Sequence, residues 1–220
     1  MQRFQFYQPI GEGLIVMKRC VKCNLPETHE TITFDSDGVC NICNQNLFKK
    51  ENINWEERKK DLDQLVEKYR GHYDYDCIVP FSGGKDSTFQ LWYIVKELKM
   101  KPLVVSYNHG GYRPLVGKNN ARTFDLLGVD IFEYKASWTV VRELMLEAFK
   151  RRGDSCWHCH TGIYAGVMQI ALRFSVPLIF WGESLAEYHS WYGYDEMEEV
   201  DEKRFNRAMN LGMTADDMYE

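Results

Sequence analysis

The sequence contains no long apolar run, and none approaches the about 20 consecutive residues that a membrane-spanning helix requires. A signal peptide is also not expected. The first 16 residues carry a single Arg, and Pro9, Gly11 and Gly13 interrupt their apolar stretch. We therefore expect a cytoplasmic protein with no membrane partner, in which residues 1–17 form an extension and either Met1 or Met17 is the natural start.

The sequence also lacks an excess of positive charge. Its 27 Lys and Arg residues are outnumbered by 32 Asp and Glu residues, which gives a formal net charge of −5. Nucleic acid binding depends on clustered cations that neutralise phosphates. The compact basic cluster in the middle of the chain, Lys150-Arg151-Arg152, is typical of a helix C-terminus, where cations complement the helix dipole. Nucleic acid is therefore not an expected partner.

Cysteine is well represented, and six of the seven cysteines fall in C-x2-C pairs. Without an export signal the thiols should be reduced, which points to metal or redox chemistry. Cys20-x2-Cys23 and Cys40-x2-Cys43 are separated by 16 residues, a spacing typical of a four-thiolate zinc site that leaves no position for a substrate. We predict a structural zinc knuckle over residues 18–50. A redox pair is disfavoured because neither pair is expected to open a helix beside a strand.

Residues 73–220 alternate between apolar strands and helices, which predicts an α/β domain with a parallel sheet and helices on both faces. The expected strands are 77–81, 103–107, 129–134 and 178–181. A helix within residues 51–72 connects the knuckle with this domain, and Gly71 ends it. Ligands of such sheets bind at the carboxyl ends of the strands, so we expect the chemistry near Ser82, Ser106 and Gly182.

One loop between a predicted strand and a predicted helix combines the features of an anion site. Its residues are Ser82, Gly83, Gly84, Lys85, Asp86 and Ser87. Two glycines allow backbone N–H groups to approach phosphate oxygens, and the helix N-terminus favours an anion. The two serines add hydroxyl donors, and Lys85 adds a mobile positive charge. The alternative is a tight turn with a capping side chain, but a cap alone does not require this combination.

The role of Asp86 stays open at this stage, because its carboxylate would repel a bare phosphate. Its position is explained either by an N-terminal helix cap or by a bridging Mg²⁺ ion. A Walker-type loop is a poor rival. The segment from Gly111 to Gly117-Lys118 has five intervening residues rather than four, and Asn119 follows where Ser or Thr would bind Mg²⁺.

A third cluster, Cys156-Trp157-His158-Cys159-His160, precedes a predicted helix. It has three interpretations. Cys156 and Cys159 could ligate a second metal ion or a cluster, for which Cys77 is the spare third thiolate. His158 or His160 could contact the substrate or the nucleotide. The cluster could also be part of the packing, and Cys77 is most simply a small core residue.

The loop resembles the SGGxDS signature of PP-loop ATP pyrophosphatases, which transfer AMP to a carbonyl oxygen and release pyrophosphate. The resemblance implies an adenine nucleotide alpha-hydrolase-like fold. It places ATP on the loop, on Ser106 and Asn108 after the second strand, and on Gly182 and Glu183 after the fourth. It makes Lys85 and Asp86 the catalytic residues.

The knuckle motifs Arg19–Thr28 and Phe34–Cys43 extend the resemblance to the N-acetyl sugar amidotransferase family of surface-polysaccharide and nonulosonic-acid biosynthesis. The loop, Asn108-His109-Gly110-Gly111, the Cys156 cluster and Trp181-Gly182-Glu183 continue the match. This resemblance implies an ATP-dependent enzyme that uses Mg²⁺ and Zn²⁺ and replaces an acetamido oxygen of a nucleotide-linked sugar with ammonia. It also implies separate glutaminase and ammonia-channel subunits as partners.

Members of that family continue past the equivalent of Glu220, so the resemblance implies a C-terminally truncated chain. Two other functions stay open. The cysteine pairs are also compatible with a tRNA thiolation enzyme that carries an iron-sulfur cluster. A zinc-containing interaction module that binds a nucleotide without turning it over is the non-catalytic alternative.

Overall fold

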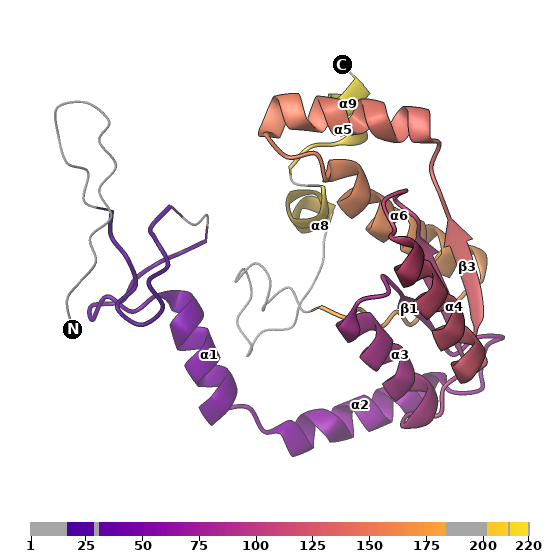
Figure 1. The fold of residues 1–220 in the computed structure, drawn as a ribbon. Coiled ribbons are helices and arrows are strands. Elements are labelled where there is room, and N and C mark those ends of the chain that lie inside the picture. The colour runs from indigo at the N-terminus through magenta and orange to yellow at the C-terminus, as the bar shows by residue number, and fades with distance from the viewer. Residues whose placement is uncertain (1–16, 29–30, 184–201, 211, 220) are drawn as a thin grey trace. The chain divides into compact units, whose positions relative to one another are not determined.

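The computed structural model describes residues 17–28, 31–183, 202–210 and 212–219. The described residues form two compact units. The smaller unit comprises described residues of 17–54, and the larger unit comprises those of 55–183 and 202–219. The elements of both units can be followed in Figure 1. The predicted extension lies outside the described residues, except for Met17. None of the described helices is long and apolar enough to cross a membrane.

The smaller unit is organised around the cysteine pairs. Two isolated antiparallel bridges, Arg19↔Pro26 and Phe34↔Cys40, bring the pairs together, and helix α1 (Asn41–Glu51) follows the second pair. Its buried core consists of Cys20, Val39 and Cys40. Residues 18–50 contain no predicted helix, because α1 buries none of its residues and therefore carries no apolar periodicity in the sequence.

The larger unit contains a parallel sheet of three strands: β1 (Cys77–Pro80), β2 (Pro102–Tyr107) and β3 (Asp130–Tyr134), in the order β1-β2-β3. The predicted fourth strand is reduced to one parallel bridge, Ile78↔Ile179, at the free edge of β1. Ile78 N donates to Leu178 O at 2.8 Å, and Phe180 N donates to Ile78 O at 2.9 Å. We refer to residues 178–180 as the bridging segment.

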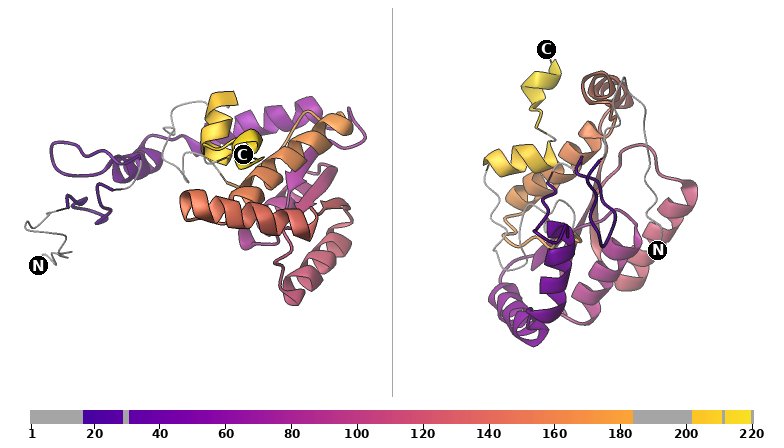
Figure 2. Two further views of the ribbon diagram at one scale, coloured as in Figure 1. Left: turned by 90° about the horizontal axis from the view of Figure 1, so that it is seen from above. Right: turned by 90° about the vertical axis from the view of Figure 1, so that its left-hand side faces the viewer.

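Helices cover both faces of the sheet, as predicted. Helices α2 (Trp55–Tyr69), α3 (Lys85–Lys96) and α4 (Pro114–Leu127) pack on the face to which Cys77, Val79 and Val104 point. Helix α6 (Trp157–Arg173) packs on the other face, against Ile78, Leu103 and Val105. Successive strand residues point to opposite faces, so a strand covered on both sides is apolar throughout. Figure 2 shows these helices from two further directions.

The C-terminal part of the described chain packs on α5 (Trp138–Arg152) and α6. Helices α8 (Glu202–Met209) and α9 (Ala215–Tyr219) contact these two helices, and Ala148, Trp157 and Met218 form a small buried cluster. Trp157 Nε1 donates to Met213 O at 3.1 Å. The basic cluster Lys150-Arg151-Arg152 lies in the last turn of α5, as its sequence indicated.

The order of the strands locates the region where a ligand is expected. The chain runs from β1 through α3 to β2 and through α4 to β3, and it then returns through α5 and α6 to the opposite side of β1. The order of the strands therefore changes direction between β1 and the bridging segment. Open α/β sheets bind ligands at such a switch point, beyond the carboxyl ends of the strands.

Candidate functional site

Two segments leave the carboxyl side of the switch point: residues 82–87, which follow β1, and Gly182-Glu183, which follow the bridging segment. Gly84 is the N-cap of α3 and provides no side-chain hydrogen bond to the helix. Gly83 has φ +81°, in the left-handed region that favours glycine. Asp86 lies in the first helical turn rather than at the cap, so the prediction that Asp86 could be the helix cap is wrong.

Hydroxyl groups fix the backbone of the loop at Gly84. Ser87 Oγ donates to Gly84 O at 3.2 Å, and Thr88 Oγ1 donates to the same oxygen at 2.8 Å. Ser82 Oγ lies 3.3 Å from Ser87 Oγ and accepts a hydrogen bond from Gly84 N at 3.4 Å. These contacts hold the turn in place before a ligand arrives, so little loop ordering has to accompany binding.

The first N–H groups of α3 are available to an anion. Within the described part of the chain, the backbone N–H groups of Lys85, Asp86 and Ser87 have no hydrogen-bond acceptor. The first turn of every helix leaves such donors unsatisfied, and the helix dipole adds partial positive charge there. A phosphate group at this position accepts hydrogen bonds from these donors and brings negative charge to the positive end of the dipole.

Lys85 and Asp86 form an ion pair at the mouth of the loop. Lys85 Nζ lies 2.6 Å from Asp86 Oδ1, and the two side chains are 87% and 61% exposed. An ion pair this exposed contributes little to stability, so a phosphate or a cation can replace it at small cost. Lys85 is then free to approach an anionic ligand, and Asp86 is free to bind a metal ion.

The two predicted nucleotide contacts after β2, Ser106 and Asn108, differ in their hydrogen bonding. Ser106 is 1% exposed, and its Oγ has no hydrogen-bond partner among the described residues. Asn108 Nδ2 donates to Glu133 Oε1 at 3.2 Å, and Asn108 Oδ1 accepts from Gly110 N at 3.0 Å. The Asn108 carboxamide therefore shapes the turn after β2.

Gly182 and Glu183 follow the bridging segment, and Gly182 lies beside α3. A Cβ atom at Gly182 would lie 3.4 Å from Gln90 Oε1, which is buried and has no hydrogen-bond partner in the described residues. Glu183 is exposed. The segment thus approaches the same helix whose N-terminus carries the loop.

The Cys156 cluster opens α6, with exposed Cys156 as its N-cap. Burial raises the pKa of the Cys159 thiol and lowers that of the His158 imidazole, which lies 3.2 Å from Ser155 O through Nδ1. Cys77 is fully buried in β1, and burial raises its pKa to about 12. The described residues bring no third ligand to Cys156 and Cys159.

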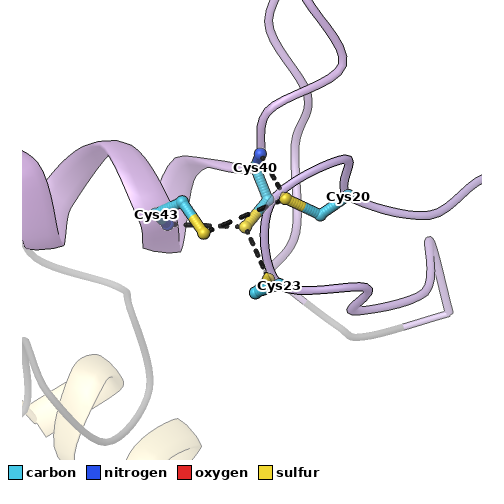
Figure 3. A group of neighbouring side chains, drawn as sticks. All are labelled: Cys20, Cys23, Cys40 and Cys43. Atoms are coloured by element: carbon cyan, nitrogen blue, oxygen red, sulfur yellow. Dashed lines mark hydrogen bonds between the residues drawn. The ribbon is translucent and has the colours of Figure 1, made fainter. Parts of the chain in front are cut away.

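The four knuckle cysteines converge on one point, as Figure 3 shows. Cys20 Sγ and Cys43 Sγ lie 3.9 Å apart, Cys23 Sγ and Cys40 Sγ lie 3.5 Å apart, and all four sulfur atoms lie within 4.8 Å of one another. Zn–S bonds of about 2.3 Å at tetrahedral angles place the sulfur atoms about 3.8 Å apart. The donor set therefore fits a single Zn²⁺ ion.

The knuckle thiols differ in their electrostatic surroundings. Burial raises the pKa of Cys43 to about 12. Burial also opposes the Cys20 thiolate, but backbone N–H groups outweigh it and lower its pKa to about 6. Cys40 is the N-cap of α1. The second pair therefore opens a helix, but the described residues of this unit form only isolated bridges and no strand, and the convergence of both pairs favours a metal ion over a redox pair.

Comparison with known proteins does not assign the chain to one family. No family model matches. An uncharacterized protein of Methanocaldococcus jannaschii is 25% identical over 175 residues, which are 79% of this chain and 61% of that protein. The chain thus spans about three fifths of the length of this curated relative.

Three solved structures are similar in part. The NH3-dependent NAD synthetase of Campylobacter jejuni has a TM-score of 0.44 at 9% identity, over 61% of this chain and 59% of that one. NMN synthetase of Francisella tularensis has a TM-score of 0.42 at 10% identity, over 77% and 75%. The tRNA thiolase NcsA of Methanococcus maripaludis has 0.39 at 15%, over 79% and 55%. Because every score lies below 0.5, the functional argument rests on the chain's own residues.

Proposed function

We propose that the chain is an ATP-dependent enzyme that cleaves ATP to AMP and pyrophosphate at the loop 82–87. The observation that supports this most directly is the set of three N–H groups without an acceptor in the described residues, together with the exposed Lys85, at the switch point of the sheet. A cradle of this kind fits two linked phosphates better than a single carboxylate, because it offers several donors and one mobile cation.

The loop would act on the pyrophosphate that leaves the α-phosphorus. Negative charge grows on the bridging oxygen as the bond to the α-phosphorus breaks. The N–H groups of α3 and the Lys85 ammonium would stabilise that charge, because they are oriented before the reaction begins. Asp86 is the carboxylate that would hold Mg²⁺, which neutralises phosphate charge when it is bound.

For the acceptor we propose the acetamido oxygen of a nucleotide-linked N-acetyl sugar, in line with the sequence resemblance. The oxygen attacks the α-phosphorus of ATP, pyrophosphate leaves, and an O-adenylated imidate forms. Ammonia then adds to the imidate carbon, and AMP departs with the former acetamido oxygen. The product is an acetamidino sugar, and ammonia would come from a separate glutaminase subunit through a channel subunit.

The knuckle would serve this enzyme as a structural element. Four thiolates complete the coordination of Zn²⁺, so no position is left for a substrate. Cys20, Val39 and Cys40 are a very small apolar core for residues 17–54, and metal binding supplies the missing folding free energy in units of this kind.

An oxygen-18 label in the acetamido group tests the proposal. The protein is incubated with ATP, Mg²⁺, ammonium and a nucleotide-linked diacetamido sugar, and the products are analysed by mass spectrometry. We expect pyrophosphate, labelled AMP and a sugar in which NH has replaced the labelled oxygen. Nucleotide binding without pyrophosphate release would favour the non-catalytic module instead. Unlabelled AMP together with an unchanged sugar would exclude the amide oxygen as the acceptor.

A further inference from the structure

Asn120 occupies a position in α4 that the pattern of its helix assigns to an apolar residue. Asn120, Phe124 and Leu127 follow one another at i, i+4 and i+7, which places them on one face of the helix. Phe124 and Leu127 pack against the core, and the Phe124 ring lies 4.8 Å from that of Phe81, directly before the loop. Asn120 continues this apolar stripe toward the loop with a carboxamide.

Asn120 is the buried residue of α4, at 9% exposure. Its carboxamide forms no hydrogen bond with another residue in the ranges that the structure describes. The side chain is thus largely buried by packing, while its carboxamide stays available to water or to a ligand, and native proteins usually pair such polar groups with a partner.

The carboxamide lies directly against the backbone of the loop. A Cβ atom at Gly83 would lie 2.9 Å from Asn120 Nδ2 and closer still to Oδ1. Gly83 is the left-handed residue from which the chain enters α3, and the free N–H groups of Lys85 and Asp86 follow it. The Asn120 carboxamide and backbone donors that have no acceptor among the described residues therefore adjoin the same turn.

We propose that Asn120 is a further ligand of the nucleotide, whose Nδ2–H group donates to an oxygen of the pyrophosphate moiety of ATP. This inference rests on the proposed function of the loop and adds a residue from a second helix to it. A neutral amide contributes a donor without adding charge, so it complements Lys85 and does not compete with it for Asp86.

Asn119 provides a matched control, because it is the same residue type on the same helix but is exposed. Calorimetric titration with inorganic pyrophosphate and with ATP is carried out in the presence of Mg²⁺ on wild type, Asn120→Asp, Asn120→Ala and Asn119→Asp. We expect Asn120→Asp to weaken both affinities by about 10- to 100-fold, since it replaces a donor with a repelling carboxylate, and Asn120→Ala by about 10-fold. Asn119→Asp should change them less than about 2-fold.

A second measurement needs no variant and separates a contact from a structural role. In wild-type protein, the side-chain NH2 resonances of Asn120 should shift during a titration with pyrophosphate, and those of Asn119 should not. Wild-type binding with no shift at Asn120, or equal affinities of the Asp variants at positions 119 and 120, would overturn this inference alone. If wild type binds neither pyrophosphate nor ATP, the proposed function fails as well.

Discussion

The knuckle and the phosphate loop both gather polar groups, but they leave them in opposite states. In the knuckle, four sulfur atoms face one another within 4.8 Å, and two of the four cysteines are buried. In the loop, three backbone N–H groups have no acceptor among the described residues, and the lysine forms only an exposed ion pair with Asp86. A closed donor set stabilises the fold that surrounds it, whereas an open set is available for a substrate.

The largest effect is expected when the knuckle loses one of its four thiolates or its metal ion. Replacement of fully buried Cys40 by Ser, or removal of the metal with a chelator, should unfold residues 17–54, because structural Zn²⁺ contributes on the order of 10 kcal/mol to domains of this kind. Zinc content and NMR signal dispersion measure the outcome. The signals of residues 55–183 should remain dispersed, since that unit has its own core.

Cys156→Ser is the matched control for this experiment. Cys156 is an exposed cysteine of a C-x2-C pair that has no third ligand in the described residues. Its replacement should leave one zinc ion per chain and an intact knuckle. Loss of zinc from the Cys156 variant, or retention of zinc by the Cys40 variant, would show that the metal is held elsewhere.

The next largest effect is expected when the phosphate loop loses the positive charge of Lys85. Lys85→Ala should lower the rate of pyrophosphate release by about 100- to 1,000-fold, as expected when one donor to a developing anion is lost. The melting temperature should stay close to that of wild type, because the ion pair that Lys85 forms is exposed. Steady-state kinetics and a thermal melt provide the two readouts.

Lys96→Ala, in the last turn of the same helix, removes an exposed lysine at the end remote from the loop. It should preserve the rate within about 2-fold, because charges separated by more than a Debye length are largely screened. Equal losses in the two lysine variants would mean that net charge, and not the position of Lys85, controls the reaction.

A smaller effect is expected from the glycine that shapes the loop. Gly83→Ala should lower the free energy of unfolding by about 1–3 kcal/mol, because alanine at φ +81° is strained and its Cβ meets the Asn120 carboxamide. Gly71→Ala isolates the first cause, since Gly71 has φ +74° with no atom within 4 Å of an added Cβ. The free energy of unfolding of both variants is measured by chemical denaturation. The additional loss in the Gly83 variant is the cost of the contact between the new Cβ and the Asn120 carboxamide. A Gly83 variant that is no less stable than the Gly71 variant would contradict the contact.

The two regions also differ in what the sequence reveals. The spacing of the cysteine pairs predicted their convergence correctly, because four ligands around one ion determine their own geometry. Helix α1 was missed, since no buried side chain marks it. The sheet was predicted from strands such as 103–107, whose residues are all buried. Residues 178–181 are also apolar, but within the described residues they pair with β1 over only two hydrogen bonds. The extent of this pairing depends on long-range contacts that a local pattern does not contain.

At the loop, the sequence identifies the residues that carry the chemistry, but it does not identify which side chains contact one another in the fold. Glycines, serines and Lys85 are recognisable because adjacent positions carry the chemistry. Asn120 lies 37 positions after Gly83, and its relevance depends on the packing of α4 beside α3. The one signal available beforehand was a polar residue in the apolar stripe of a helix. Asn108 and Asp86 show the same limit, because the sequence does not indicate that Asn108 Nδ2 donates to Glu133 or that Asp86 pairs with Lys85.

The smallest effect tests a single side chain that belongs to neither the knuckle nor the loop. Thr214 and Asp217 form a reciprocal capping box at α9: Asp217 N donates to Thr214 Oγ1 at 3.2 Å, and Thr214 N donates to Asp217 Oδ2 at 2.7 Å. These bonds from Thr214 hold the pKa of Asp217 below its usual 3.8. A depressed carboxyl pKa stabilises the fold above 3.8, and this contribution is lost as the pH falls through the folded-state value.

Asp217→Asn should therefore melt at a slightly lower temperature than wild type at pH 7, and the difference should shrink once the pH falls below 3.8. Asp216→Asn makes the same change of charge one residue earlier, and it should leave the melting temperature nearly unchanged at every pH. The comparison is measured by thermal melts of the three proteins over a pH series. A difference between wild type and Asp217→Asn that grows as the pH falls would reverse the sign and exclude the capping box as its cause.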